Sequence, residues 1–297
     1  MGSRGCRVGR ALAASFTAFV VPLVAFTVGG CGLFPSFDEL QGGVAEQASL
    51  DASTDGSTAV ASDSGDAQNA ECPGTAPPAM VRVGSFCIDS TEVTKAQYKA
   101  FTEAAGEDLH YQPKSCGWNT TLYPGRSGEP HVKDWPVPAG LEDLPITLVN
   151  WCQASAYCSW AGKRLCGRIG GGSTPMASAQ DPNVSQWMAA CSHAGTRRYP
   201  YGDTFQANAC VVSASGAMPV KSHAACEGGY PGIFDMSGNV HEWEDSCRDT
   251  DPEPKACEIR GGAFDTTDST GARCDLTDFP QFANLAGDNV GFRCCSP

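Results

Sequence analysis

Hydrophobic and polar positions divide the chain into three parts. Residues 11–28 contain no charged residue and are mostly apolar. Residues 32–71 carry eight acidic residues, no lysine or arginine, and few aromatic side chains. From residue 72 onwards apolar residues recur at the spacings of short helices and strands, and all six tryptophans lie in this part. Because 226 residues can bury a sizeable core, we expect one folded domain over 72–297.

Two helices are predicted from capping residues. Thr94 is followed three residues later by a glutamine, which is a capping box, so we predict a helix over 94–104 that Gly106 ends. Asn150 can cap a second helix that begins at the next residue, and Gly162 stands just past its end.

Weaker signals predict a third helix and three strands. Asp181 precedes a proline, as at a helix start, and the apolar stripe Val184, Trp187, Met188 and Cys191 follows. Strand-like segments lie at 80–88, 258–264 and 290–295. Short elements separated by many glycines and prolines indicate an α+β domain with little regular structure, whose loops are held by cross-links.

Cysteine usage supports such cross-links and an oxidising compartment. The chain has 16 cysteines, and 14 of them lie in 72–297, an even number that allows up to seven disulfides. No Cys-x-x-Cys motif occurs and the five histidines are scattered, so the sequence favours disulfides over a zinc site.

The N-terminal segment has the layout of an export signal. Three arginines precede the apolar stretch, which ends in Val-Gly-Gly followed by Cys31. This is the bacterial lipoprotein pattern, so we predict a signal peptide over 1–30, cleavage before Cys31 and a lipid on its sulfur. The alternative is an uncleaved transmembrane anchor, which Pro22 disfavours. Both alternatives place the domain in the cell envelope, on the periplasmic or extracellular face.

The net negative charge of the chain makes nucleic acid an improbable partner. The formal net charge is −13, which argues against a nucleic-acid-binding protein because such proteins usually carry a basic face. The acidic residues of 31–71 accompany serine, alanine, glycine and threonine, so we predict a disordered tether there. A lipid-anchored domain would then contact the membrane through its lipid alone.

Six strings, in order, carry a family resemblance. The strings are MVRVGSFCIDSTEVTKAQYKAF (80–101), LPITLVNWCQASAYCSWAGKRLC (144–166), QWMAACSHAGTRRYPYGD (186–203), GYPGIFDMSGNVHEWEDS (229–246), IRGGAF (259–264) and VGFRCC (290–295). Through them the chain resembles the formylglycine-generating enzyme family, also called the sulfatase-modifying-factor domain. The resemblance implies a C-type-lectin-like fold of low secondary-structure content with buried calcium.

The resemblance also identifies a departure from the family's chemistry. Catalytic members oxidise a sulfatase cysteine to formylglycine with molecular oxygen, and two active-site cysteines bind Cu(I). Here these two positions read Thr266 and Gly271, and no cysteine occurs between Cys257 and Cys274. Because Cu(I) selects soft thiolate ligands, we expect no copper chemistry and no catalytic residue.

Three functions remain open at this stage. We favour a non-catalytic binding or scaffold module whose groove takes a peptide, a glycan or a partner protein. One alternative is a copper-dependent formylglycine-generating oxidase with altered ligands, in which Cys274 stands in as a lone thiolate. Another is a different enzyme on the same fold, since fold does not determine function.

Two disulfides are implied by the resemblance, Cys158–Cys294 and Cys191–Cys274. Ten further cysteines of the domain are additional to the family's two bridges. Cys247–Cys257 is a guess from the short loop between them, Cys295 could compete with its neighbour, and the sequence assigns no other pair.

A structural calcium site is also implied by the resemblance. Its ligands would be the side chain of Asp235, the carbonyl oxygens of Gly238 and Val240, and the side chain of Glu242. Carboxylate and carbonyl oxygens are the ligands that calcium prefers. The alternative is a plain turn and short helix with Glu242 in water.

Overall fold

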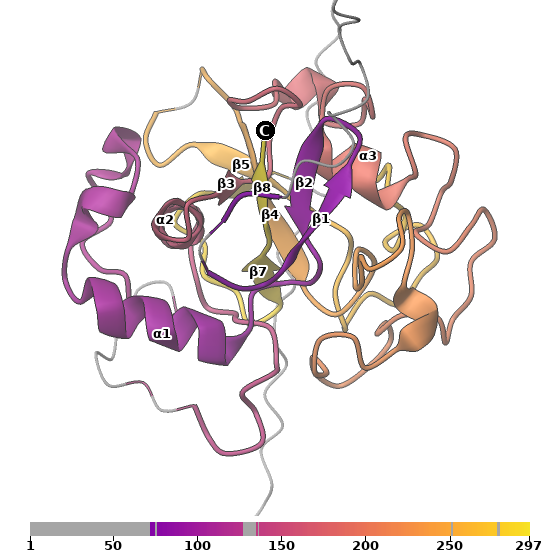
Figure 1. Ribbon diagram of the computed structural model, residues 1–297, viewed down its shortest axis with the longest axis horizontal. Helices are drawn as coiled ribbons and strands as arrows, with labels where there is room; N and C mark the ends of the chain where they lie inside the picture. The colour runs from indigo at the N-terminus through magenta and orange to yellow at the C-terminus, as the bar shows by residue number, and fades with distance from the viewer. Residues whose placement is uncertain (1–71, 75, 127–134, 136, 251, 278–279) are drawn as a thin grey trace, which may run out of the picture. The chain divides into compact units, whose positions relative to one another are not determined.

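The computed structural model describes residues 72–297, apart from 75, 127–134, 136, 251 and 278–279 (Figure 1). The predicted signal peptide, the lipidated Cys31 and the predicted tether lie outside the described residues. Among the residues that the structure describes, no helix combines the length and the apolar character needed to cross a membrane.

The first of two four-stranded sheets contains the C-terminus. Its order is β1-β2-β8-β3, and every neighbouring pair is antiparallel. The predicted strand at 80–88 is a hairpin instead, because Gly84 takes a positive φ of 56° and turns the chain between β1 and β2. The strands are β1 (Met80–Val83), β2 (Phe86–Asp89), β3 (Arg164–Leu165) and β8 (Cys294–Ser296).

The second sheet has the order β6-β5-β4-β7. Strands β4 and β5 form an antiparallel pair, and β7 joins β4 in parallel. The predicted strand regions at 258–264 and 290–295 therefore correspond to β5 and to β7 with β8, with shifted ends. The strands are β4 (His241–Cys247), β5 (Ala256–Arg260), β6 (Gln281–Phe282) and β7 (Val290–Phe292).

The first two predicted helices are confirmed with their caps. Thr94 and Asn150 each form a complete capping box at the start of α1 and α2, and Gly106 is the C-cap of α1. The helices are α1 (Lys95–Ala105), α2 (Trp151–Trp160) and α3 (Gln186–Cys191). Short 3-10 turns are η2 (Leu109–Tyr111), η3 (Lys114–Cys116), η4 (Met176–Ser178) and η5 (Ala224–Cys226).

The predicted start of the third helix is wrong. Asp181 begins a turn, in which its carbonyl accepts from the N–H groups of Val184 and Ser185. The N-cap of α3 is Ser185, whose hydroxyl accepts from the N–H of Met188 at 3.0 Å. Ser185 is held extended by a bridge to Arg168, a contact that no local sequence signal contains.

Two large buried clusters form most of the core, and a small third one surrounds the Cys210–Cys226 bridge. One gathers α1, α2, β4 and β7 around the rings of Tyr98, Phe101, Tyr157 and Phe292. The other packs α3 against β2, and Trp187 is fully buried there. Figure 1 shows α1 and α2 to one side of the strands and α3 to the other.

Seven disulfides use all 14 cysteines of 72–297. Cys158–Cys294 and Cys191–Cys274 are the two pairs that the family resemblance implies, and the short-loop guess Cys247–Cys257 is also present. Such a density of disulfides indicates a protein that folds in an oxidising, extracytoplasmic compartment. The remaining pairs are Cys72–Cys87, Cys116–Cys152, Cys166–Cys295 and Cys210–Cys226.

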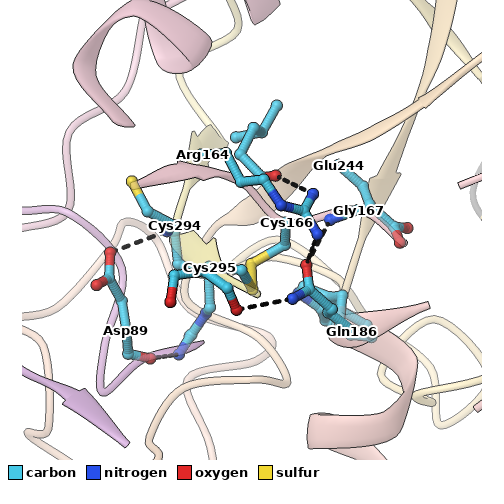
Figure 2. The surroundings of a disulfide bond; sticks show 12 residues. Asp89, Arg164, Cys166, Gly167, Gln186, Glu244, Cys294 and Cys295 are labelled. Carbon is cyan, nitrogen blue, oxygen red and sulfur yellow. Dashed lines mark hydrogen bonds between the residues drawn. A yellow bond between two sulfur atoms is a disulfide. The ribbon is translucent and has the colours of Figure 1, made fainter. Parts of the chain in front are cut away.

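Adjacent cysteines attach the C-terminal strand to two different elements. Cys294 bonds to Cys158 in α2, and Cys295 bonds to Cys166, just after β3. Figure 2 shows Gln186 beside the second bond, where its side chain accepts from Gly167 N at 3.2 Å and donates to the Ser296 carbonyl at 3.0 Å. The competition suggested for Cys295 is thus resolved by two separate partners.

Candidate functional site

Thr266 and Gly271, the positions that replace the family's copper ligands, lie side by side. Thr266 Oγ1 accepts from Ala263 N at 2.9 Å, and its own N–H donates to the Ala263 carbonyl at 3.0 Å. A Cβ atom placed on Gly271 would stand 2.6 Å from Thr266 Cγ2. The two residues are therefore in contact within the loop, but neither supplies a thiolate.

Cys274 does not supply one either. Its sulfur is bonded to Cys191 and is fully buried in the second core cluster. Since every cysteine of 72–297 is described and paired, no free thiol remains in this part of the chain. The alternative in which Cys274 is a lone thiolate is therefore wrong, and the disulfide to Cys191 that the resemblance implies is present.

Arg260 lies just before the loop that contains Thr266 and Gly271, and it binds the segment that follows this loop. Its fully buried guanidinium lies over the Trp187 ring at 4.9 Å and donates to the carbonyls of Ala179 and Cys274 at 3.0 and 2.9 Å. Gly261 and Gly262 follow at φ values of 88° and 72°, which glycine adopts without strain. The Arg-Gly-Gly string thus has a structural role that does not depend on the cysteine pair.

Three of the four predicted calcium ligands, Asp235, Gly238 and Val240, lie in a sharply bent loop before β4. Asp235 and Asn239 both have φ of 60°, a left-handed conformation in which Asp and Asn are enriched among non-glycine residues. Gly238, at φ 76°, approaches the Val211 carbonyl so closely that a Cβ would lie 2.3 Å from its oxygen. The backbone course of this loop is therefore determined by residue types that the sequence specifies.

Glu242 is in strand β4 and is 1% exposed, so the alternative with this carboxylate in water is wrong. Arg293 donates to it from Nε and Nη2, at 2.7 to 2.9 Å, and Trp187 Nε1 donates to it at 2.8 Å. Arg293 also donates to the carbonyls of Asp89 and Phe234, at 3.1 and 2.8 Å. This network joins both sheets to α3.

Glu92 is a member of this site that the sequence analysis missed. It is fully buried, and neither carboxylate oxygen has a hydrogen-bond partner among the residues that the structure describes. Burial, followed by the nearby carboxylates of Asp235 and Glu242, raises its pKa well above the usual range, against the opposing effect of Arg293. An acidic residue between Thr91 and Val93, just before a helix cap, was the available signal.

Asp235 contributes a second unpaired acceptor. Its Oδ2 accepts from Lys221 N at 2.7 Å, whereas its buried Oδ1 has no hydrogen-bond partner. Burial is the main cause that raises the pKa of Asp235. Three buried carboxylates, Glu92, Asp235 and Glu242, thus surround one guanidinium, that of Arg293.

The described residues contain no group of three or more histidine, cysteine, aspartate or glutamate side chains placed to hold a metal. The predicted calcium set is of another kind, because two of its four ligands are backbone carbonyls. Orphaned, buried carboxylate oxygens on Asp235 and Glu92 fit a hard cation, since oxygen ligands of this type are those that calcium takes.

The family model for the sulfatase-modifying factor enzyme 1-like domain matches residues 44–296. The chain belongs to this family. The match to the sulfatase-modifying factor family begins before residue 72, within the segment predicted to be a tether, and reaches the last residue but one.

Relatives in this family differ in what their names state. The mouse inactive C-alpha-formylglycine-generating enzyme 2 is 28% identical over 264 residues, 75% of this chain and 79% of that protein. The formylglycine-generating enzyme of Thermomonospora curvata is 26% identical, over 57% of this chain and 62% of that protein. Names of both kinds thus occur among relatives of similar identity.

Other matches are partial or distant. The serine/threonine-protein kinase pkn1 of Chlamydia caviae is 30% identical over 161 residues, which are 54% of this chain but only 22% of the kinase. The solved structure of CarF aligns with 74% of this chain and 88% of its own, at a TM-score of 0.49 and 21% identity.

Proposed function

We propose that this protein is an exported, lipid-anchored binding or scaffold module of the sulfatase-modifying factor family that does not carry out formylglycine chemistry. The observation that carries the proposal is the paired state of every cysteine in 72–297, with Thr266 and Gly271 adjacent where the family has its two thiols. Without a thiolate pair the loop has no soft ligands for Cu(I).

The anchoring part of the proposal rests on the sequence. Arginines, an apolar stretch and Cys31 after two glycines support lipidation, and seven disulfides support export. A module of this kind would stand in the periplasm or on the cell exterior. The C-type-lectin-like arrangement implied by the resemblance is also part of the proposal, consistent with short strands and few helices. Its ligand would be a peptide, a glycan or a partner protein.

The competing function, a copper-dependent formylglycine-generating oxidase, makes an opposite prediction. The full-length chain, purified with its disulfides intact, is supplied with Cu(I), oxygen and a sulfatase-type Cys-x-Pro-x-Arg peptide. We expect the peptide mass to stay unchanged, because no sulfur ligand is available for copper. An active family enzyme, treated in the same way, is the positive control. Aldehyde formation by this chain would overturn the proposal.

We further propose that a structural calcium ion belongs to this module. It would be held by Asp235, the carbonyl oxygens of Gly238 and Val240, and Glu242, and the nearby carboxylate of Glu92 would add negative charge. Three carboxylates around Arg293 leave a buried excess of negative charge when ionised, which a divalent cation would neutralise. The ion would supply stability and take part in no chemistry.

Calcium is therefore expected to raise the thermal unfolding temperature of the chelator-treated, full-length chain. A ligand at 100 times its Kd stabilises the folded state by about 2.7 kcal/mol. Asp235→Asn should reduce this gain. Glu92→Gln should also reduce it, while stabilising the calcium-free protein by removing a buried carboxyl from among like charges.

The matched control for these variants is Asp143→Asn, which changes an exposed aspartate and should leave the calcium response intact. Differential scanning calorimetry with calcium and with a chelator makes the measurement. Equal unfolding temperatures in the two conditions, or an undiminished gain in Asp235→Asn, would contradict the calcium proposal.

A further inference from the structure

A small cavity lies at the end of the β4–β5 hairpin that is remote from the Thr266 loop. Cys247 pairs with Cys257 at this end, whereas Glu242 pairs with Arg260 at the other. The cavity has a volume of about 110 Å³. It is lined by residues from η3, α2, β4 and the loop that joins β4 to β5.

Two tryptophans form apolar walls of the cavity. Trp151, the first residue of α2, is held in place because its Nε1 donates to the Glu244 carbonyl at 3.0 Å. Trp118 is partly buried, and its Nε1 has no hydrogen-bond partner among the described residues although the atom is buried. The two indole rings therefore border the cavity from different elements.

Two disulfides brace the same walls. Cys116–Cys152 joins the segment before Trp118 to α2, next to Trp151, and Cys247–Cys257 closes the hairpin. All four cysteines line the cavity. Both bridges are additional to the two that the family resemblance implies, and they hold the walls of the cavity in place.

The charged groups at the cavity are mainly acidic. Asp245, Asp249 and Glu253 line it, against one ammonium group, that of Lys255, which lies 3.7 Å from Asp249. Asp245 is the deeper acid and accepts from Ser173 Oγ at 2.8 Å. Burial raises the pKa of Asp245, and this hydrogen bond together with the charge of Arg164 opposes the rise.

We propose that this cavity binds a basic side chain, lysine or arginine, of a peptide or protein ligand. Aromatic faces attract cations, and carboxylates at the rim add direct charge complementarity. The inference deepens the proposed binding role and depends on it, because it names the chemical class of the ligand.

The test is isothermal titration of the full-length chain with the tripeptide Gly-Lys-Gly and its uncharged analogue Gly-norleucine-Gly. We expect binding of the lysine peptide and at least about tenfold weaker binding of the analogue, which corresponds to 1.4 kcal/mol. Asp249→Asn with Glu253→Gln should weaken the lysine peptide severalfold. Since both side chains are exposed, the double variant is expected to fold.

The matched control is Glu142→Gln with Asp143→Asn, which removes two adjacent exposed charges outside the cavity. Unchanged affinity in this control supports a local site. The inference would be overturned if both double variants bound the lysine peptide equally weakly, if the two tripeptides bound equally well, or if neither bound. Displacement of the lysine peptide by a glycan such as cellobiose would also overturn it. None of these outcomes changes the result expected in the formylglycine assay. Failure of the cavity inference is therefore distinguishable from failure of the proposed non-catalytic function.

Discussion

Replacing Cys158, Cys166, Cys294 and Cys295 with alanine, which removes both bridges of the C-terminal strand, is expected to lower the free energy of unfolding by about 5 kcal/mol. The two bonds link residues 136 and 129 apart and close nearly the same long loop, so only their joint removal returns the conformational entropy of that loop to the unfolded chain. All four cysteines are fully buried, and the bonds fasten the C-terminal strand to α2 and to the segment after β3. Because a domain is usually stable by only about 5–15 kcal/mol, this one change consumes a large part of the total.

The matched comparison is the Cys247–Cys257 bridge, which spans only 10 residues. Its removal by the same alanine substitutions is expected to cost about 3 kcal/mol, because a short loop has less closure entropy. Denaturant titration without reducing agent, followed by circular dichroism, measures both losses. An equal loss of unfolding free energy in the two alanine variants would show that local packing, and not the length of the closed loop, decides how much these bridges stabilise the fold.

Arg293→Met is expected to destabilise the domain by about 3–5 kcal/mol, the usual result of removing one partner of a buried ion pair. The substitution leaves Glu242 without its bidentate partner, and it leaves Glu92 and Asp235 without the one guanidinium near them. Two buried carbonyls also lose their donor. Chemical denaturation of the purified variant measures the loss.

Two further variants separate charge from packing at this site. The double variant Arg293→Met with Glu242→Gln should recover part of the stability, because it removes a charge that would otherwise be buried and unpaired. Arg126→Met breaks an exposed pair with Asp288, at 3.0 Å, and should cost less than about 1 kcal/mol. A double variant as unstable as Arg293→Met alone would assign the loss to packing.

Local sequence signals predicted the helices well where both ends carry a cap. Thr94 was identified from its capping box and Asn150 as a capping residue, and both form their cap bonds within the first turn of the helix, without help from elsewhere in the chain. The start of α3 was placed at Asp181, because Ser185 becomes the cap only through its bridge to Arg168. Gly84 turns the chain within what alternation alone indicated as one strand.

In the candidate sites too, some residues were predictable from the sequence and others were identified only from tertiary contacts. Asp235 and Glu242 were named because the family resemblance implies a calcium site within one short motif, whose residues are neighbours along the chain. Glu92 lies about 140 positions earlier in the sequence and joins them only when β2 and β4 fold into one core. The acidic cavity between Trp118 and the β4–β5 loop was likewise not predicted.

The sequence by itself determined the family, the capped helices, the lack of cysteines at Thr266 and Gly271, and the oxidising compartment, because each depends on residue identity or on neighbours along the chain. Only the tertiary structure decided that Cys274 is already bonded, that Glu242 is paired with Arg293, and which cysteines form the other bridges. Those facts depend on contacts between distant segments, and many pairings of 14 cysteines are compatible with one spacing. Burial also depends on packing. Glu92 becomes a buried carboxylate without a hydrogen-bond partner among the described residues only when the chain has folded.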